Sequence, residues 1–412
     1  MKKNLFVGSP TMKFIWESEE TATLYSIANS IYLLENIIKK GGQFPDVVLV
    51  DIYKKIEPST QIEITKLLNI LVEDVLCEEI NFELVPKKLP KTKTQKIVFK
   101  PCDTICLYSG GVDSSIGILK SKEEYGDVRA LYVAHKYTGR IDGKVEYLNK
   151  VVLKPKKIIL HKFIAPEWLK DYSQTRGFLY FLYGGILAHL IKSKRLIISE
   201  CGQTMYQPKF APLDTITYTT HPYVLEIAKT ILGLILKKDI DIITMFEDFT
   251  KSELINLMPD DKLLSNTHSC VTGRWKDNCG TCYACLTRIL GSINNKLSIF
   301  YFRKNPFLIP DNEDLNALIN FCFKYLYDKE DIDFWSFRSI EHFKKNDLFN
   351  RVADEVFLAL FILKKQGILH PNYEFVLDEY LAKDAKRLDI RRKQLEQIKE
   401  PDFKKIVKNY VL

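Results

Sequence analysis

The sequence predicts an α/β protein in three parts: a parallel-sheet core domain at 97–293, an N-terminal α+β addition at 1–96 and a helical C-terminal addition at 294–412. In the central part, short apolar runs alternate with helical patterns, which is typical of a parallel sheet covered by helices. The first of these runs passes through two glycines directly into a helical pattern. After about Leu297 only helical periodicity remains.

The composition favours a folded protein. Of 412 residues, 46% are hydrophobic, and 60 Lys+Arg against 52 Asp+Glu give a net charge of +8, which excludes a mainly disordered chain. Glycines and prolines without a period exclude a collagen-like chain. No uninterrupted apolar run reaches the ~18 residues of a membrane span, and the N-terminal apolar run is too short for a signal peptide. We therefore expect a cytoplasmic protein without membrane contact.

The two additions carry simple patterns. In the N-terminal part, Asp46–Ile52 is a strand-like run and Ile62–Leu76 has apolar residues at helical spacing. The Lys- and Pro-rich stretch Pro86–Lys96 predicts a linker. In the C-terminal part, Asn312 predicts a helix start, and Glu355–Lys364 has helical periodicity.

Four strands and two helices are predicted in the central part. The strands are Thr104–Tyr108, Val128–Val133, Lys157–Leu160 and Leu196–Ser199. The helices are Ser114–Lys122 and the apolar stretch Gly177–Lys192. Parallel sheets bind ligands at the carboxyl ends of their strands, near the point where the strand order reverses. We expect the functional site at that edge.

The segment after the first strand is predicted to bind a phosphate group. It consists of Ser109, Gly110, Gly111, Val112, Asp113, Ser114 and Ser115. The glycines allow a tight turn, and the first N–H groups of the following helix point at the loop with the positive end of the helix dipole. The serine hydroxyls add donors, whereas Asp113 is suited to Mg²⁺ or to capping local amides. The simpler alternative is an ordinary strand–helix turn with Asp and Ser as N-cap residues.

Nine cysteines without an export signal indicate metal binding or catalysis rather than disulfides. Four of them cluster in the sequence: Cys270, Cys279, Cys282 and Cys285. These spacings predict a closed, structural Zn²⁺ site, with an iron–sulfur cluster or a redox dithiol as alternatives. Cys201 or His268 could replace one ligand, although His268 is expected at the surface. The scattered cysteines are expected in the core: Cys77, Cys102, Cys106, Cys201 and Cys322.

The stretch Lys383–Lys408 is basic. It has ten Lys/Arg against five Asp/Glu. Such a stretch is most often the solvated face of a terminal helix. Contact with nucleic acid or an acidic partner is the alternative, which the lack of interleaved aromatic residues does not favour.

Three stretches together resemble the QueC family of PP-loop ATPases, the 7-cyano-7-deazaguanine synthases of queuosine biosynthesis. They are Leu107–Ser115, Phe249–Ile255 and Ser269–Arg288. The second has its own physical signal, because Thr250 and Glu253 fit a capping box that starts a helix with Lys251 in its first turn. The resemblance covers roughly residues 100–292. It implies an adenine nucleotide alpha hydrolase-like PP-loop fold that uses ATP, Mg²⁺ and Zn²⁺.

The resemblance also implies roles for individual residues. The catalytic set is Ser109, Asp113, Ser114, Lys251 and Arg176. Lys251 would reach a phosphate or the substrate carboxylate. Arg176, in a turn ahead of the long apolar helix, would pair with a phosphate or adenylate. Glu200 and Gly202, at the end of the fourth strand, would bind the guanine-like edge of a deazaguanine.

The chain departs from the family in length and in its substrate-binding stretches. Classical members lack both terminal additions. Ala134–Gly139 stands where the family has an Asp-Tyr-Gly-Gln-like stretch, and a Pro-Asp-Cys-Arg-like stretch after the fourth strand is missing. Longer QueC-like chains with such additions occur in bacterial anti-phage defence gene clusters, and this chain resembles those more closely.

By this resemblance, the chain would use ATP to activate 7-carboxy-7-deazaguanine, releasing pyrophosphate, and an amine would then attack the acyl adenylate. Ammonia would lead to 7-cyano-7-deazaguanine, whereas the amine of a protein acceptor or partner subunit would give a conjugate. A homodimer is compatible with the family. Two alternatives stay open: a tRNA-modifying PP-loop ligase or thiolase, and a non-catalytic ATP-sensing scaffold of a defence complex.

Overall fold

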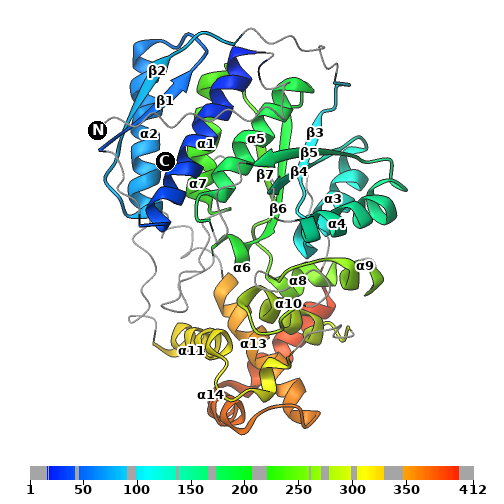
Figure 1. Ribbon diagram of the computed structural model, residues 1–412. Helices are drawn as coiled ribbons and strands as arrows, with labels where there is room; N and C mark the ends of the chain where they lie inside the picture. Colours follow the sequence, from blue (N-terminus) through cyan, green and yellow to red (C-terminus); the bar gives the residue numbers. More distant parts are fainter. Residues whose placement is uncertain are drawn as a thin grey trace.

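In the computed structural model, the N-terminal addition lies beside the central sheet and the C-terminal addition lies below it in the view of Figure 1. The structure describes residues 16, 18–41, 46–90, 99–135, 139–165, 173–206, 220–258, 261–270, 278–297, 304–328 and 347–398, apart from the side chains of 135, 139–142 and 261–262. The predicted linker Pro86–Lys96, the stretch Ala134–Gly139 and the basic stretch Lys383–Lys408 lie partly outside these residues.

Five parallel strands form the central sheet in the order β5-β4-β3-β6-β7. They are β3 (Thr104–Leu107), β4 (Arg129–His135), β5 (Ile159–Ala165), β6 (Arg195–Cys201) and β7 (Asp241–Phe246). The first four confirm the predicted strands, although β5 begins at Ile159 rather than Lys157. Strand β7 was not predicted, because its apolar run closely follows an apolar helix from which periodicity does not separate it.

Helices cover both faces of this sheet. Helices α3 (Val112–Tyr125) and α4 (Gly139–Leu148) lie on one face, and α5 (Arg176–Leu190) and α7 (Pro222–Leu236) lie on the other. The other helices of this part are α6 (Gly202–Met205), α8 (Lys251–Asn256), α9 (Asp261–Asn266) and α10 (Tyr283–Asn294), with a π-helical turn at Asn149–Leu153. Helices α3 and α5 confirm the two predicted helices. Successive strand residues point to opposite faces, so Ile105 packs in the core with α5 and α7, whereas Cys106 packs in the core with α3 and α4.

The N-terminal addition packs against α5 and α7. It consists of α1 (Glu19–Lys39), β1 (Val47–Ile52), α2 (Pro58–Leu76) and β2 (Asn81–Pro86), and the two strands pair in parallel. Helix α1 contacts α5 and α7, and α2 contacts α7. The predicted strand and helix are confirmed, but Ile62 is 71% exposed and lies outside the apolar face of α2.

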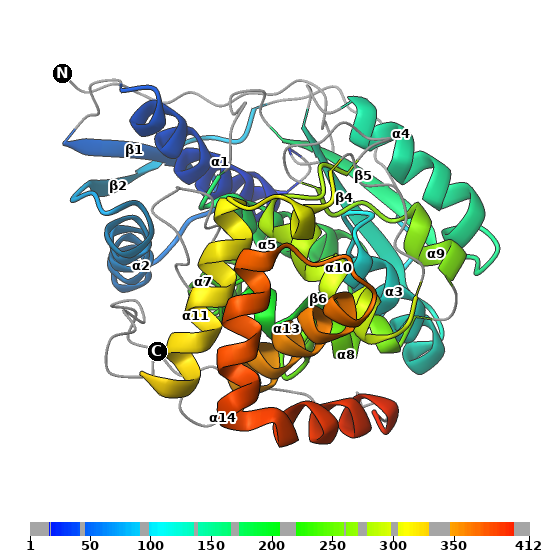
Figure 2. The same ribbon diagram turned by 90° about the horizontal axis from the view of Figure 1, so that it is seen from below.

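The C-terminal addition is helical. It comprises the 3₁₀ turn Pro306–Leu308, α11 (Glu313–Tyr327), α13 (Leu348–Lys365) and α14 (Pro371–Glu396). Asn312 caps α11 as predicted, because its side chain accepts a hydrogen bond from Leu315 N at 2.9 Å. Helix α14 bends at Asp384, where φ is −143°, and α13 packs against α10, α11 and α14 (Figure 2).

One apolar core runs from α1 through α5 and α7 to α13 and α14. Because this core includes residues from all three predicted parts, it does not mark the boundaries between them, which stay a prediction. Four of the scattered cysteines are buried as expected, but Cys77 is exposed at the end of α2, so its assignment to the core was wrong. Among the described residues, no helix is long and apolar enough to cross a membrane.

Candidate functional site

The strand order reverses between β3 and β6. From β3 the chain continues to β4 and β5 on one side, then returns to β6 and β7 on the other. Parallel sheets bind ligands at the carboxyl edge of such a reversal. The glycine loop follows β3, Glu200 lies at the end of β6, and Lys251 begins α8 after β7. The predicted site residues therefore share one edge of the sheet.

The glycine loop is folded by hydrogen bonds of its own. Gly110 has φ +75°, and a Cβ there would lie 3.2 Å from Val145 Cγ2. The Oγ atoms of Ser109 and Ser114 are 3.1 Å apart, and Gly111 N donates to Ser109 Oγ at 3.3 Å. A larger residue at position 110 would therefore be strained in its backbone and crowded by α4.

The start of α3 offers backbone N–H groups rather than a side-chain cap. Gly111 is the N-cap residue, and no side chain caps the helix there. The alternative with Asp or Ser as the N-cap is therefore wrong. Ser109 is exposed and Gly111 is half-buried. The N–H groups in the first turn of α3 therefore follow directly on a part of the loop that solvent reaches. This arrangement fits a phosphate group.

The Asp113 carboxylate reaches across to β6 and α8. Its Oδ2 accepts a hydrogen bond from Cys201 N at 3.2 Å. Lys251 Nζ donates to both Asp113 oxygens, at 2.5 and 2.6 Å. Asp113 and Lys251 are 5% and 9% exposed. Since removing one partner of a buried pair leaves an unpaired charge, this contact fixes α8 relative to α3.

Glu200 adds a second carboxylate beside this pair. Burial and the neighbouring Asp113 raise the pKa of Glu200 to about 8, while the charges of Lys251 and Arg176 oppose the rise. Burial lowers the pKa of Lys251, but Asp113 and Glu200 outweigh it, so this pKa lies above its ordinary value. Lys251 is therefore a cation at neutral pH. The structure brings four predicted site residues into one electrostatic group.

Lys251 is held from two sides. The capping box is confirmed: Thr250 Oγ1 accepts from Glu253 N at 3.2 Å, and the Glu253 carboxylate accepts from Thr250 N at 2.9 Å. Sequence reasoning missed Gln203, whose Oε1 accepts from Lys251 N at 3.0 Å. Its place next to Gly202 at the end of β6 is the only signal that could have identified it.

The remaining predicted site residues have distinct surroundings. A Cβ at Gly202 would lie 1.9 Å from the Glu247 carbonyl oxygen, so only glycine fits where β6 and β7 end. Val112 and Ser115 are buried in α3. Arg176 is half-buried at the start of α5, and its guanidinium lies 5.9 Å from the centre of the Tyr180 ring. Contacts of these residues with a substrate stay predictions.

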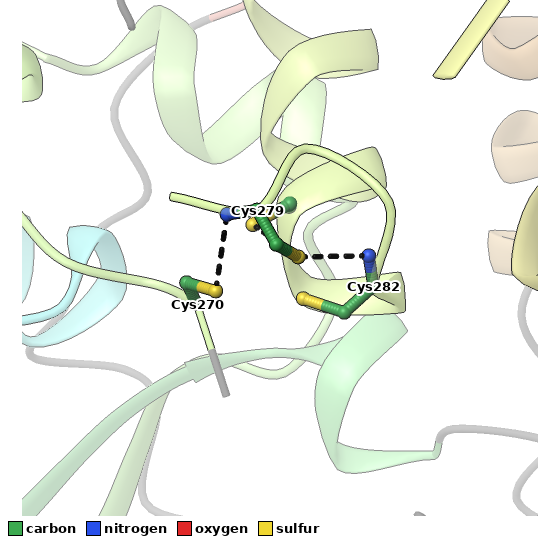
Figure 3. A group of neighbouring side chains, drawn as sticks. Cys270, Cys279 and Cys282 are labelled. Carbon is green, nitrogen blue, oxygen red and sulfur yellow. Dashed lines mark hydrogen bonds between the residues drawn. The ribbon is translucent and has the colours of Figure 1, made fainter. Parts of the chain in front are cut away.

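The four clustered cysteines converge on one point. The sulfur atoms of Cys270, Cys279, Cys282 and Cys285 all lie within 4.8 Å of one another. The sulfur atoms of Cys279 and Cys285 are 3.9 Å apart. Two thiolates bound to a tetrahedral Zn²⁺ are separated by about 3.8 Å, which is close to this value. In Figure 3, Cys279 N points at Cys270 Sγ and Cys282 N at Cys279 Sγ, each at 3.3 Å. Such N–H donors stabilise thiolate charge, so the donor set fits a zinc knuckle.

The segment that leads into this knuckle also contacts the glycine loop. His268 N donates to Gly110 O at 3.1 Å. Thr267 O accepts from Lys144 Nζ at 2.7 Å and from Arg288 at 3.0 Å. His268 is half-buried rather than at the surface as expected, and it is not one of the four converging residues. The knuckle thus supports one side of the loop.

Comparison with known proteins identifies part of this site. Residues 218–296 match the family model described as "Queuosine biosynthesis protein QueC". The matched range includes Lys251 and the four cysteines of the knuckle. The chain therefore contains a segment that is similar to the QueC family. The glycine loop and Glu200 lie outside the matched range, and the structure joins them to Lys251 through Asp113. No curated protein matches the chain.

Proposed function

We propose that this protein uses ATP to activate the carboxylate of 7-carboxy-7-deazaguanine, forming AMP and pyrophosphate, and transfers the acyl group to an amine. The family match supports an ATP-dependent enzyme of the synthase or ligase type. The observation that carries the proposal is the group formed by Asp113, Lys251 and Glu200 beside the glycine loop. The parallel sheet, with this loop after β3, supports a PP-loop fold for the central part.

The first step forms one bond and breaks one. A carboxylate oxygen of the substrate attacks the α-phosphorus of ATP, and the bond to the α,β-bridging oxygen breaks with its electrons leaving on pyrophosphate. Positioning and electrostatics dominate such a step. The N–H groups at the start of α3 and the hydroxyls of Ser109 and Ser114 would hold the pyrophosphate. Arg176 would pair with the adenylate.

Lys251 supplies a fixed positive charge at this edge, because Asp113 binds its ammonium through both carboxylate oxygens. The Asp113 carboxylate also offers oxygen ligands of the kind Mg²⁺ prefers. Mg²⁺ bound with ATP would neutralise part of the charge on the leaving pyrophosphate. Zn²⁺ in the knuckle would be structural, since four thiolates leave no open position.

Glu200 is proposed to recognise the guanine-like edge of the substrate. An ionised carboxylate accepts two N–H groups side by side, and such charge-assisted pairs are strong. With a pKa of about 8, Glu200 is mostly protonated at neutral pH before substrate binds. Donors on the substrate would favour its ionised form.

The second step replaces AMP by an amine. Ammonia gives an amide, and a second ATP-dependent activation then removes the amide oxygen to give the nitrile. A protein amine gives a stable deazaguanine–protein conjugate instead, and the two terminal additions favour such a larger acceptor. The mass of the product distinguishes the two routes.

The test is pyrophosphate release from Mg-ATP with and without 7-carboxy-7-deazaguanine. Release that depends on the deazaguanine supports the proposal. Asp113→Asn and Ser109→Ala should reduce it, the former by about 100-fold or more. Asp378→Asn, which breaks the exposed Asp378–Lys364 pair on the C-terminal helices, is the control and should leave the rate unchanged. Undiminished release in both loop variants would contradict the assignment.

The tRNA-modifying alternative relies on the basic C-terminal stretch. In its described part, basic side chains already pair with carboxylates: Lys383 with Glu379, Arg387 with Asp354 and Arg392 with Asp389. These contacts reduce the charge available to phosphates. Deazaguanine-independent release that requires RNA would support this alternative, and ATP binding without any release would support a scaffold.

A further inference from the structure

A buried ionic cluster joins the C-terminal addition to the start of α8. The carboxylates of Glu253 on α8 and Glu355 on α13 meet the guanidinium of Arg391 on α14. Glu253, Glu355 and Arg391 are 5%, 3% and 2% exposed. The bend of α14 at Asp384 separates its first half from the turn that carries Arg391 (Figure 2).

The cluster ends on the residue that precedes Lys251. Glu355 Oε1 accepts a hydrogen bond from Thr250 Oγ1 at 2.6 Å and one from Arg391 Nε at 3.2 Å. Arg391 also donates to the Glu253 oxygen that Arg351 contacts. The other Glu253 oxygen accepts from Thr250 N. The N–H and the hydroxyl of Thr250 are therefore both bound to carboxylates that Arg391 contacts.

The charges in this cluster depend on one another. Burial alone would raise the pKa of Glu253, but Arg351 and Arg391 outweigh it and lower that pKa. Burial raises the pKa of Glu355, which Arg391 opposes. Without Arg391, two buried carboxylates would face each other with one guanidinium fewer, and they would separate or take up protons. Either change would disturb the Thr250 cap.

We propose that Arg391 and Glu355 are positioning residues, through which the C-terminal addition fixes the Thr250 cap and so holds the Lys251 ammonium against Asp113. This inference rests on the proposed function, in which Lys251 acts at the reacting phosphates. Lys251 Nζ reaches Asp113 from the first turn of α8, directly after the Thr250 cap. A cap that loosens therefore moves the ammonium away from Asp113 and Glu200.

The chain offers a matched control. Arg387 lies four positions before Arg391 on α14 and also pairs with α13, through Asp354 at 2.8 and 3.1 Å. That pair joins the same two helices, and its contacts do not include α8. Losing it tests the packing of the addition without touching the cap.

The experiment compares Arg391→Met, Glu355→Gln and Arg387→Met in the full chain. Arg391→Met should lower kcat/KM for deazaguanine-dependent pyrophosphate release at least about tenfold. Glu200 faces Asp113, Lys251 and Arg176. Arg391→Met should also move the inflection that Glu200 gives to the pH profile of kcat/KM to higher pH. Amide hydrogen exchange in Lys251–Asn256 should become faster. Arg391→Lys should restore part of each. Glu355→Gln should act in the same direction, and Arg387→Met should change neither the inflection nor the exchange.

Three outcomes decide whether Arg391 and Glu355 position Lys251. If Arg391→Met and Arg387→Met lower activity only in proportion to their unfolding free energies, with one common inflection, the proposal is overturned. If Arg391→Met does not fold, Glu355→Gln decides on the same readouts. If the wild-type chain releases no pyrophosphate, the proposed function fails, yet exchange in α8 still tests the positioning: unchanged exchange in Arg391→Met overturns it.

Discussion

Helix α1 of the N-terminal addition and helix α13 of the C-terminal addition each bring a buried carboxylate to a turn that carries a predicted site residue. On the N-terminal side, Glu35 contacts the turn ahead of Arg176. On the C-terminal side, Glu355 contacts the cap ahead of Lys251. The two turns begin α5 and α8. Both additions thus support the site from outside the sheet.

The chemistry of the two supports differs. Glu35, fully buried, accepts hydrogen bonds from Ser173 Oγ, Gln174 N, and the N and Oγ1 of Thr175, at 2.6 to 3.0 Å. One cation, Lys39, lies 3.0 Å away. The C-terminal cluster instead alternates two carboxylates with two guanidinium groups.

The N-terminal support also has aromatic contact behind it. Tyr25 stacks on Tyr183 with ring centres 5.8 Å apart, and Tyr183 OH donates to Asn29 at 3.1 Å. The N-terminal side therefore depends on local hydrogen bonds to one carboxylate, whereas the C-terminal side depends on the balance of opposite charges. Different substitutions should therefore disrupt the two contacts: loss of the Glu35 carboxylate on the N-terminal side, and loss of one charge on the C-terminal side.

Removing the Zn²⁺ proposed for the four cysteines should have the largest effect, and only on the C-terminal side. Tyr283 N, at the start of α10, donates to Asp314 of α11 at 3.1 Å, so knuckle and addition are joined. Structural Zn²⁺ contributes on the order of 10 kcal/mol of binding free energy in small domains. Chelation should speed amide exchange in α10 and α11 and leave α1 and α5 protected. Equal loss of protection in α1 would show that the N-terminal addition also depends on the metal, contrary to this expectation.

Glu35→Ala should have the second largest effect. It removes the acceptor for four donors, and we expect a loss of about 3 kcal/mol of unfolding free energy, since buried unpaired donors cost about 1–3 kcal/mol each and relax partly. Urea unfolding measures this. Glu20→Ala, on the same helix and paired with Lys54 at a partly exposed position, is the control, with a loss below about 1 kcal/mol. Similar losses in the two variants would contradict a specific role for Glu35.

The pH profile should distinguish the two supports. If Glu200 must be ionised to bind the substrate edge, kcat/KM falls as pH drops below about 8. Arg176 and Lys251 both lower the pKa of Glu200, Lys251 more strongly. Glu35→Ala, which frees Arg176, should therefore shift the inflection to higher pH, and Arg391→Met should shift it further. Glu200→Gln should abolish the inflection, and an inflection that stays in Glu200→Gln would show that another group titrates.

Arg392→Gln should have the smallest effect. Arg392 follows Arg391 directly, but its partner is Asp389, and both side chains are more than half exposed. Exposed pairs of this kind contribute about 0.2–1 kcal/mol or less. Urea unfolding and pyrophosphate release should therefore stay close to wild type. A loss as large as that of Arg391→Met would mean that the whole basic face matters, not the buried guanidinium.

The sequence predicted the elements that have strong local signals. The glycine loop, the capping box at Thr250 and the clustered cysteines each combine residue type with short spacing, and the structure places them as expected. The convergence of Asp113 with Lys251 could not be derived in this way. It depends on the strand order, which sets β6 and β7 beside β3.

The supports from the additions were also beyond local reasoning. Arg391 belongs to a stretch that was predicted to be a solvated face, yet it is 2% exposed. Its burial follows from the bend at Asp384 and from carboxylates on α8 and α13, which are far away in the sequence. Glu35 is one of several acidic residues in the N-terminal part, and only tertiary packing gives it four donors.

The fate of the carboxylate oxygen of the proposed substrate tests the activation step directly. In a reaction with 7-carboxy-7-deazaguanine labelled with ¹⁸O in its carboxylate, attack on the α-phosphorus makes one carboxylate oxygen the bridge of the acyl adenylate. Attack by the amine then leaves that oxygen on AMP. We therefore expect AMP that carries one ¹⁸O. AMP without label, or ADP and phosphate as products, would contradict this expectation.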